Sequence, residues 1–227
     1  MSFMSDKFPR ILHFPWSPGA KNDDRIAGPD WYDFLKDKKI IITEKIDGEN
    51  TCFKKDGVFA RTHSVTNRNE WASYLWPVYD TIVSELGDFE IFGENMYAVH
   101  SIEYEKLYSY FYVFAIRDKG VWLSWEDTKY FAEYFNFQYV PEINYFTIGE
   151  VMEDEKHFEL CIKQCAKTSR LGNTCEGVVV RVTDSFPDPG DSTMGYNVLK
   201  YVRKGHVQTD EHWTRNWKKA KIYGTNI

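Results

Sequence analysis

The segment ITEKIDGENTCF, residues 42–53, places a lysine amine among carboxylates at the end of an apolar run. Lys45 closes that run, and Glu44, Asp47 and Glu49 flank it along the chain. A lysine amine is a nucleophile only when it is deprotonated, so the charges of its neighbours decide its reactivity. An Asp-Gly pair after a strand is also the usual signal for a β-hairpin, whose charges are simply solvated. Taken alone, this segment therefore favours the hairpin.

Three more charged residues occupy similar positions in the sequence. Glu94, Glu176 and Lys200 each lie in or beside an apolar run that is typical of a strand. Strand interiors rarely hold such side chains, because burying an unpaired charge is costly in free energy. Carboxylates bind divalent cations and lysines bind phosphates, so these residues and Lys45 would form a polyphosphate and metal site if their strands converge on one groove. The order of the residues along the chain leaves that convergence open.

Periodicity predicts the elements that must position these residues. Apolar runs predict strands, with a hairpin turn at Asp56-Gly57, over residues 39–46, 51–62, 88–99, 107–118, 120–125, 176–182 and 196–202. Helical spacing predicts helices, the first interrupted by Pro77 and the last with a basic side, over residues 69–86, 126–135, 153–169 and 208–222. Residues 1–35 are expected to form an irregular lead-in. No repeat or linker divides the chain, so we expect one α+β domain, residues 1–227, built on antiparallel sheet.

Composition excludes several classes of protein. The chain of 227 residues is 43% hydrophobic and 17% aromatic, which indicates a folded domain with a substantial core. No apolar run approaches the roughly 20 residues that span a bilayer, and the N-terminus lacks the pattern of a secretory signal. The four cysteines lack paired metal-binding spacing, which favours reduced thiols in a cytoplasmic protein.

Charge is unevenly distributed along the chain. The formal net charge of −6 argues against general coating of nucleic acid. Residues 200–221, however, contain seven basic and two acidic side chains. This basic stripe is compatible with local phosphate binding, and equally with one solvated face of a helix.

Several of these segments together resemble a known superfamily. EKIDG resembles the Lys-x-Asp-Gly signature of the covalent nucleotidyltransferases, which include ATP-dependent polynucleotide ligases and mRNA capping enzymes. FGENMYAVHSI resembles their third motif, YFYVFAIRD the aromatic strand that follows, EGVVVR the fourth motif and VLKYVRKGHV the fifth. The GEN and HSI extensions are most similar to the RNA ligase family of phages and their relatives. The resemblance covers about residues 40–213 and depends on the ordered set, because the first motif alone arises by chance in about one chain in twenty.

The resemblance implies both a fold and an activity. The fold would be an α+β nucleotidyltransferase domain, an ATP-grasp-like adenylation domain with two antiparallel sheets flanking a nucleotide groove. The activity would be that of an ATP-dependent RNA ligase, which forms a lysyl-AMP intermediate, adenylylates a 5′-phosphate and seals it to a 3′-hydroxyl. Its cofactors would be ATP and Mg²⁺ or Mn²⁺, and its partners RNA ends. The compartment would be the cytoplasm, or the host cytoplasm if the source is a phage.

The resemblance also assigns roles to matching residues. Lys45 would carry AMP, and Lys200 would assist it and lower its pKa. Phe114 would stack on adenine, and Arg61 would hold the ribose or the incoming 5′-phosphate. The remaining nucleotide-site residues would contact adenine, shape the turn, approach the leaving group or bind ribose and metal: Glu44, Ile46, Gly48, Asn50, Glu94 and Glu176, of which Glu94 and Glu176 are the metal ligands. A weaker set, together with the aromatic Trp213 and Trp217, would contact nucleic acid: Arg203, Lys204, His206, His212, Arg215 and Lys218.

The chain departs from the family pattern at two positions. Ala115 stands where an aspartate usually follows the aromatic strand's phenylalanine, and Val202 stands where the fifth motif usually has its second lysine. Arg203 or Lys204 is expected to compensate for Val202. No appended OB domain is expected, so an accessory protein or an oligomer would take its place.

Three other functions remain compatible with the sequence. A DNA ligase would share the chemistry of Lys45 but prefer a different 3′-hydroxyl strand. A guanylyltransferase of the capping type would use GTP. A non-catalytic nucleotide- or RNA-binding module would keep the groove without chemistry, and the altered fifth motif favours that reading.

Overall fold

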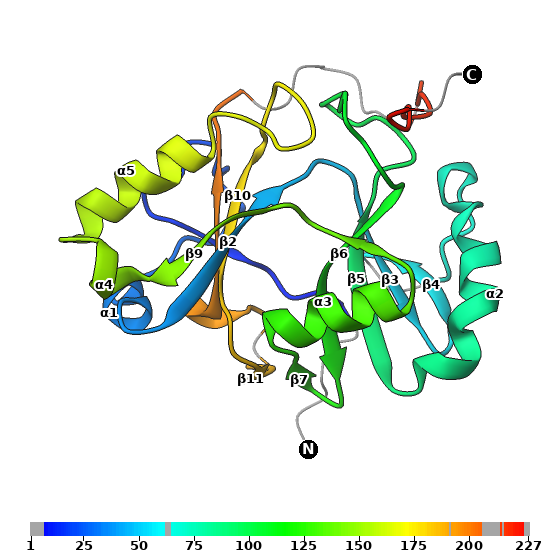
Figure 1. The fold of residues 1–227 in the computed structure, drawn as a ribbon, viewed down its shortest axis with the longest axis horizontal. Helices are drawn as coiled ribbons and strands as arrows, with labels where there is room; N and C mark the ends of the chain where they lie inside the picture. Colours follow the sequence, from blue (N-terminus) through cyan, green and yellow to red (C-terminus); the bar gives the residue numbers. More distant parts are fainter. Residues whose placement is uncertain (1–6, 62–64, 191, 206–213, 215, 225–227) are drawn as a thin grey trace.

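The computed structural model describes residues 7–61, 65–190, 192–205, 214 and 216–224. Two sheets form the body of the molecule and lie side by side, with α1, α4 and α5 flanking one and α2 and α3 flanking the other (Figure 1). The first sheet has the strand order β1 (Leu12–His13), β12 (Val198–Val202), β10 (Gly177–Val182), β2 (Lys39–Lys45) and β9 (Glu142–Thr147).

The second sheet contains the hairpin and the aromatic strand. Its strand order is β11 (Phe186–Pro187), β7 (Val121–Trp122), β6 (Phe111–Asp118), β5 (Phe89–Asn95), β3 (Glu49–Lys54) and β4 (Gly57–Ala60), with β8 (Gln138–Tyr139) beside β6. Pairing is antiparallel except for β1 with β12 and β6 with β8. The expected α+β class with two largely antiparallel sheets is confirmed.

The predicted hairpin forms one residue earlier than its Asp-Gly signal suggests. Lys54 pairs with Gly57, so the two-residue loop consists of Lys55 and Asp56. Gly57 takes a φ of +137°, a backbone conformation that residues with a Cβ rarely adopt. The glycine is therefore required at the start of β4 and not at the second position of the turn.

Five helices are found in the described residues, with two short 3₁₀ turns. They are α1 (Trp31–Leu35), α2 (Leu75–Leu86), α3 (Trp125–Tyr134), α4 (Ile148–Val151) and α5 (Glu155–Cys165), and the 3₁₀ turns are Glu70–Ala72 and Gly195–Asn197. The helix predicted over residues 69–86 is divided into a 3₁₀ turn and α2, and Pro77 lies in the first turn of α2, where an N–H has no helical partner. None of the helices in the described part of the chain has the length and apolar character that a bilayer crossing requires.

Caps fix where two of these helices start. The Ser124 side chain accepts a hydrogen bond from Asp127 N at the start of α3, and Asp154 accepts from His157 N at the start of α5.

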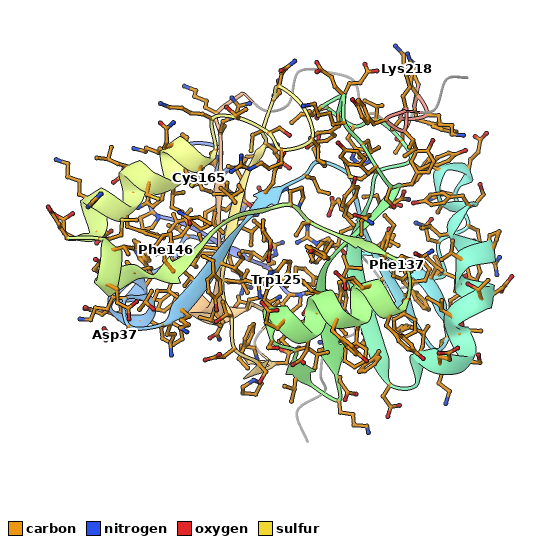
Figure 2. The ribbon with its side chains drawn as sticks, in the orientation of Figure 1. Asp37, Trp125, Phe137, Phe146, Cys165 and Lys218 are labelled. Atoms are coloured by element: carbon orange, nitrogen blue, oxygen red, sulfur yellow. The ribbon has the colours of Figure 1, made fainter. Side chains whose placement is uncertain are left out.

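Aromatic and aliphatic side chains fill the space beneath the helices and between the sheets (Figure 2). Trp31 and Phe158 belong to the same buried cluster as Phe92 of the second sheet, so one core joins both sheets.

Two expectations about the ends of the chain need correction, and one strand in the middle of the chain was missed. The lead-in is not wholly irregular, because it supplies β1 and α1. Strand β9 was not predicted, since its burial does not alternate cleanly. The basic helix over residues 208–222 is absent from described residues 216–222, which run alongside the loop after β5: Ala98 bridges Lys219, and Val99 N donates to Lys218 O at 2.8 Å. Residues 208–213 and 215 lie outside the described residues.

Candidate functional site

A cavity of about 640 Å³ lies between the two sheets. Its walls come from β2, β10 and β12 on one side and from β3, β5 and β6 on the other. Its lining combines charged residues, among them Lys45, Glu94 and Lys200, with the ring of Phe114 and with Arg181. We call this space the interstrand cavity.

Lys45, which lines this cavity, forms an ion pair with Glu176. Lys45 is the last residue of β2, and its register partner on β10 is Gly177, so Glu176 lies directly beside it. The lysine Nζ donates to Glu176 Oε2 at 2.6 Å. The glutamate side chain is 7% exposed and the lysine side chain 28%, so the amine keeps an open side toward the cavity. Pairing of β2 with β10 therefore fixes the separation of the two groups.

Glu94 and Asp47 surround the same amine from the second sheet and from the turn. Glu94 is in β5, and its Oε1 accepts a hydrogen bond from Gly48 N at 3.1 Å. Asp47 Oδ2 accepts from Ser101 N at 2.8 Å, and Asp47 N donates to Tyr104 Oη at 2.9 Å. These bonds hold the Lys45 turn against β5 and the loop after it, which brings Glu94 to the amine.

Two glycines are required here because other atoms approach their backbone closely. A Cβ on Gly177 would lie 2.0 Å from the Tyr201 carbonyl oxygen, and one on Gly48 would lie 2.6 Å from that of Asn95. Gly48 was expected to supply a tight turn. The structure gives a different reason, because its φ is not positive and the residue is instead packed against the end of β5.

The carboxylates change the protonation of the amine. Burial alone would lower the pKa of Lys45, but the charges of Glu176 and Glu94 more than offset it, so its pKa is raised. Lys200 was expected to lower the pKa of Lys45, but in the protein alone the two carboxylates outweigh that effect. The pKa of Glu94 is raised to about 8, first by burial, against the opposing effect of Lys45, and then by Glu176 and Asp47. Three carboxylates therefore lie near one amine, and the protonated form of Glu94 is favoured at neutral pH.

The carboxylates near Lys45 suit a divalent cation that would arrive with phosphates. Within the described residues no group of three or more histidine, cysteine, aspartate or glutamate side chains is arranged to hold a metal. Mg²⁺ is commonly held by one or two carboxylates together with substrate phosphates, and Glu94 and Glu176 offer that number. Asn50, the register partner of Glu94, adds a buried Oδ1 that has no hydrogen-bond partner among the described residues. The oxygen-only set suits Mg²⁺ or Mn²⁺.

The apolar part of the cavity lining is suited to a flat ring. Phe114 of β6 lines it with Val179 of β10, and the Phe8 ring packs edge-on against Phe114 with centroids 5.0 Å apart. Ile46 is buried and also lines the cavity. Ala115, which replaces the family's usual aspartate, is buried beside Phe114 and leaves no carboxylate at its position.

Arg181 was not predicted as a site residue. It lines the cavity at 4% exposure and donates to the carbonyls of Leu123, at 2.8 Å, and Phe114, at 3.3 Å. It has no carboxylate partner within the described residues, and burial lowers its pKa to about 10. In the sequence it looked like an ordinary polar residue at a strand end, and no local pattern distinguishes it.

Glu44 faces away from Lys45. Its carboxylate accepts hydrogen bonds from Ser169 Oγ at 2.5 Å and Arg170 N at 2.6 Å, in the segment after α5. Its pKa is raised by burial, against the effect of those two hydrogen bonds. Its contact with an adenine amino group stays a prediction, and the geometry favours a structural role that fixes the end of β2.

Lys200 approaches the cavity from β12 through an unpredicted set of partners. Lys200 Nζ lies 3.6 Å from Asp24 Oδ1, while Asp24 Oδ2 lies 3.3 Å from His13 Nε2. His13 is the register partner of Lys200 on β1, and Ser17 Oγ contacts its Nδ1 at 3.0 Å. The pKa of Lys200 is lowered, first by burial and then by Lys45. The lead-in thus positions a residue of the fifth motif.

The remaining predicted residues lie in different places, and only Arg61 among those described lines the cavity. Arg61 follows β4, is exposed and lines the cavity. Arg203 does not line it, because its Nε donates to Cys175 O at 2.5 Å, so it does not stand in for the lysine that Val202 replaces. Lys204 and Lys218 are exposed and away from the cavity lining. Four predicted residues lie outside the described residues: His206, His212, Trp213 and Arg215. Trp217 packs against Trp71 and Tyr97.

Comparison with known proteins identifies what this site is similar to. The family model described as RNA ligase matches residues 38–202, which contain every cavity residue named above except Phe8. No curated protein sequence matches the chain.

Solved structures of RNA ligases share the fold. An apo mutant of Naegleria gruberi RNA ligase matches with a TM-score of 0.57 and 17% identity over 92% of this chain and 60% of that one. A second mutant of that ligase, solved with ATP and Mn, matches with a TM-score of 0.57 and 19% identity over 90% and 62%. An archaeal ATP-dependent RNA ligase matches with a TM-score of 0.54 and 17% identity over 87% and 48%. The chain therefore spans about half to three fifths of the length of these structures.

Proposed function

Because this chain belongs to the RNA ligase family, we propose that it is an ATP-dependent RNA ligase that works through a lysyl-AMP intermediate. The observation that carries the proposal is the 2.6 Å contact between Lys45 Nζ and Glu176 Oε2 at the wall of the interstrand cavity. The neighbouring structures solved with ATP or AMP and Mn support the choice of nucleotide and metal.

The proposed reaction begins at Lys45. Its deprotonated Nζ attacks the α-phosphorus of ATP, a phosphorus–nitrogen bond forms, and the bond to the bridging oxygen breaks to release pyrophosphate. An oxygen of an RNA 5′-phosphate then attacks the same phosphorus and displaces Lys45. Finally, a 3′-hydroxyl attacks the activated 5′-phosphorus, and AMP leaves as the phosphodiester forms.

The cavity residues take distinct parts in this scheme. Phe114 and Val179 hold the adenine between them, and Lys200 and Arg61 bind phosphate oxygens. Asn50, Glu94 and Glu176 would hold the divalent cation. When bound, the cation neutralises developing charge on the phosphates and offsets the carboxylates that raise the pKa of Lys45.

Intact mass spectrometry tests the proposal. Incubation with ATP and Mn²⁺ or Mg²⁺ is expected to add the mass of one AMP to the native chain and nothing to Lys45→Ala. GTP in place of ATP tests the capping alternative, and a panel of RNA and DNA ends tests the polynucleotide. A native chain that binds ATP without forming the adduct would instead be a non-catalytic binding module, the alternative that Val202 favours.

A further inference from the structure

A second, smaller cavity adjoins the interstrand cavity. It has a volume of about 340 Å³, and we call it the cationic cavity. Arg61 and Lys200 line both spaces, so the two cavities are neighbours. The remaining cations come from the lead-in: Lys7, Arg10 and Arg25. These three residues lie outside the segment 38–202 that matches the family model.

Backbone pairing holds the lead-in in place around this cavity. Arg10 N donates to Ser192 O at 2.8 Å, and the Arg10 guanidinium donates to Asp23 O at 2.9 Å. His13 N donates to Arg25 O at 2.8 Å, and β1 pairs with β12 so that His13 lies opposite Lys200. The positions of Arg10 and Arg25 are therefore set by the fold, because their own backbones are tied to the protein.

The charges in the cationic cavity do not balance. Five cations line it, and the only carboxylates in its lining are those of Asp23 and Asp24. Asp24 is already committed, since its Oδ2 accepts from Lys21 N at 2.9 Å and contacts His13. His13 adds no charge at neutral pH, because burial and then Lys200 lower its pKa to about 4. The excess is positive and adjoins the interstrand cavity at Arg61 and Lys200, which line both spaces.

We propose that the cationic cavity, with Arg10 and Arg25 as its principal donors, binds a substrate phosphate group other than the one that reacts with Lys45. This inference rests on the proposed function for the position of the reacting phosphate. Guanidinium groups match the geometry of phosphate oxygens through paired N–H donors. Two sources share this chemistry: the terminal phosphates of ATP and the 5′-phosphate of an RNA end.

Binding of inorganic pyrophosphate tests the site without requiring any catalysis. Arg25 is exposed, so Arg25→Ala leaves the core intact, and Lys156→Ala is a matched control because Lys156 is exposed on α5 and lines neither cavity. Calorimetric titration of the full chain should show about tenfold weaker binding for Arg25→Ala and for Arg10→Ala, and no change for Lys156→Ala. Arg25→Lys should recover part of the loss. Equal affinity in the native chain and both arginine variants overturns the proposal.

Separate reaction steps identify the source of the phosphate. If ATP supplies it, Arg25→Ala raises the KM for ATP in lysine adenylylation and leaves the sealing of pre-adenylylated RNA unchanged. If RNA supplies it, adenylylation stays normal while AMP transfer to a 5′-phosphate end weakens. The calorimetric result is independent of the proposed function: pyrophosphate binding that depends on Arg25, in a chain that never forms a lysine adduct, supports this site and contradicts the ligase assignment.

Discussion

Lys45 Nζ and Glu176 Oε2 lie 2.6 Å apart across the paired strands β2 and β10. Lys45 is the last residue of its strand, and Glu176 precedes the first residue of the other. Of the two residues, Lys45 lines the interstrand cavity. Under the proposed function, the carboxylate would hold the amine in the resting protein and release it toward a phosphate.

Replacing Glu176 should separate its effect on the pKa of Lys45 from its proposed role as a cation ligand. In Glu176→Gln the charge that raises the pKa of Lys45 is lost, so the amine should react with an acylating reagent at lower pH than in the native chain. Adenylylation should nevertheless fall about 100-fold, because a cation ligand is lost as well. Lysine labelling followed across pH checks the first effect. Native-like adenylylation by Glu176→Gln would exclude a role for this carboxylate in holding the cation.

Glu94 should make stability depend on pH. Its pKa is raised by burial to about 8 from an ordinary 4.5. A carboxyl whose folded pKa is raised stabilises the fold fully below the unfolded value, and this stabilisation is lost as pH rises through 8. The free energy of unfolding should therefore decline between those two pH values in the native chain and decline less in Glu94→Gln. Urea unfolding at about pH 5 and about pH 9 measures the difference. Parallel pH dependence in the two proteins would contradict the assignment.

Phe114 should govern nucleotide affinity more than chemistry. Phe114→Ala removes an aromatic face from the cavity lining on which adenine would stack. The KM for ATP should therefore rise about tenfold while the maximal adenylylation rate changes little. Tyr130→Ala serves as the control, because Tyr130 is 63% exposed on α3. A loss in rate without a change in KM would show that the ring does not bind the base.

Asp24 should act through Lys200. The carboxylate raises the pKa of Lys200 against burial and the charge of Lys45, both of which lower it. Asp24→Asn should therefore shift the alkaline limb of the adenylylation rate profile to lower pH, because Lys200 then loses its proton earlier. Asp33→Asn, at an exposed position on α1, should leave the limb where it is. If the alkaline limb is unshifted in Asp24→Asn, Asp24 does not control the protonation of Lys200.

Local sequence patterns anticipated part of this site. Lys45, Glu176 and Lys200 were predictable because each interrupts or ends an apolar run, and strand pairing brings such ends together. Arg181 could not be recognised, since a buried arginine held by carbonyl oxygens has the same local sequence as an exposed one. The role of Asp24 was hidden because it depends on the pairing of β1 with β12, nearly the full length of the chain apart.

The helix predicted at the C-terminal end was wrong in residues 216–222 for a related reason. Its charges and aromatics repeat at helical spacing, yet Trp217 packs against Trp71, and Ala220 N donates to Tyr97 O at 2.8 Å. These contacts, with the 3₁₀ turn Glu70–Ala72 and with the loop after β5, include a backbone hydrogen bond in place of one that a helix would form internally. Tertiary packing therefore overrides the local preference in residues 216–222.

The most direct test of the central claim is to map the AMP adduct to a single side chain. The native chain would be incubated with ATP and Mn²⁺, digested, and sequenced by tandem mass spectrometry under conditions that preserve a phosphoramidate. We expect AMP on Lys45, with Lys200 unmodified. An adduct on Lys200 or another lysine, or an adduct that survives in Lys45→Ala, would contradict it.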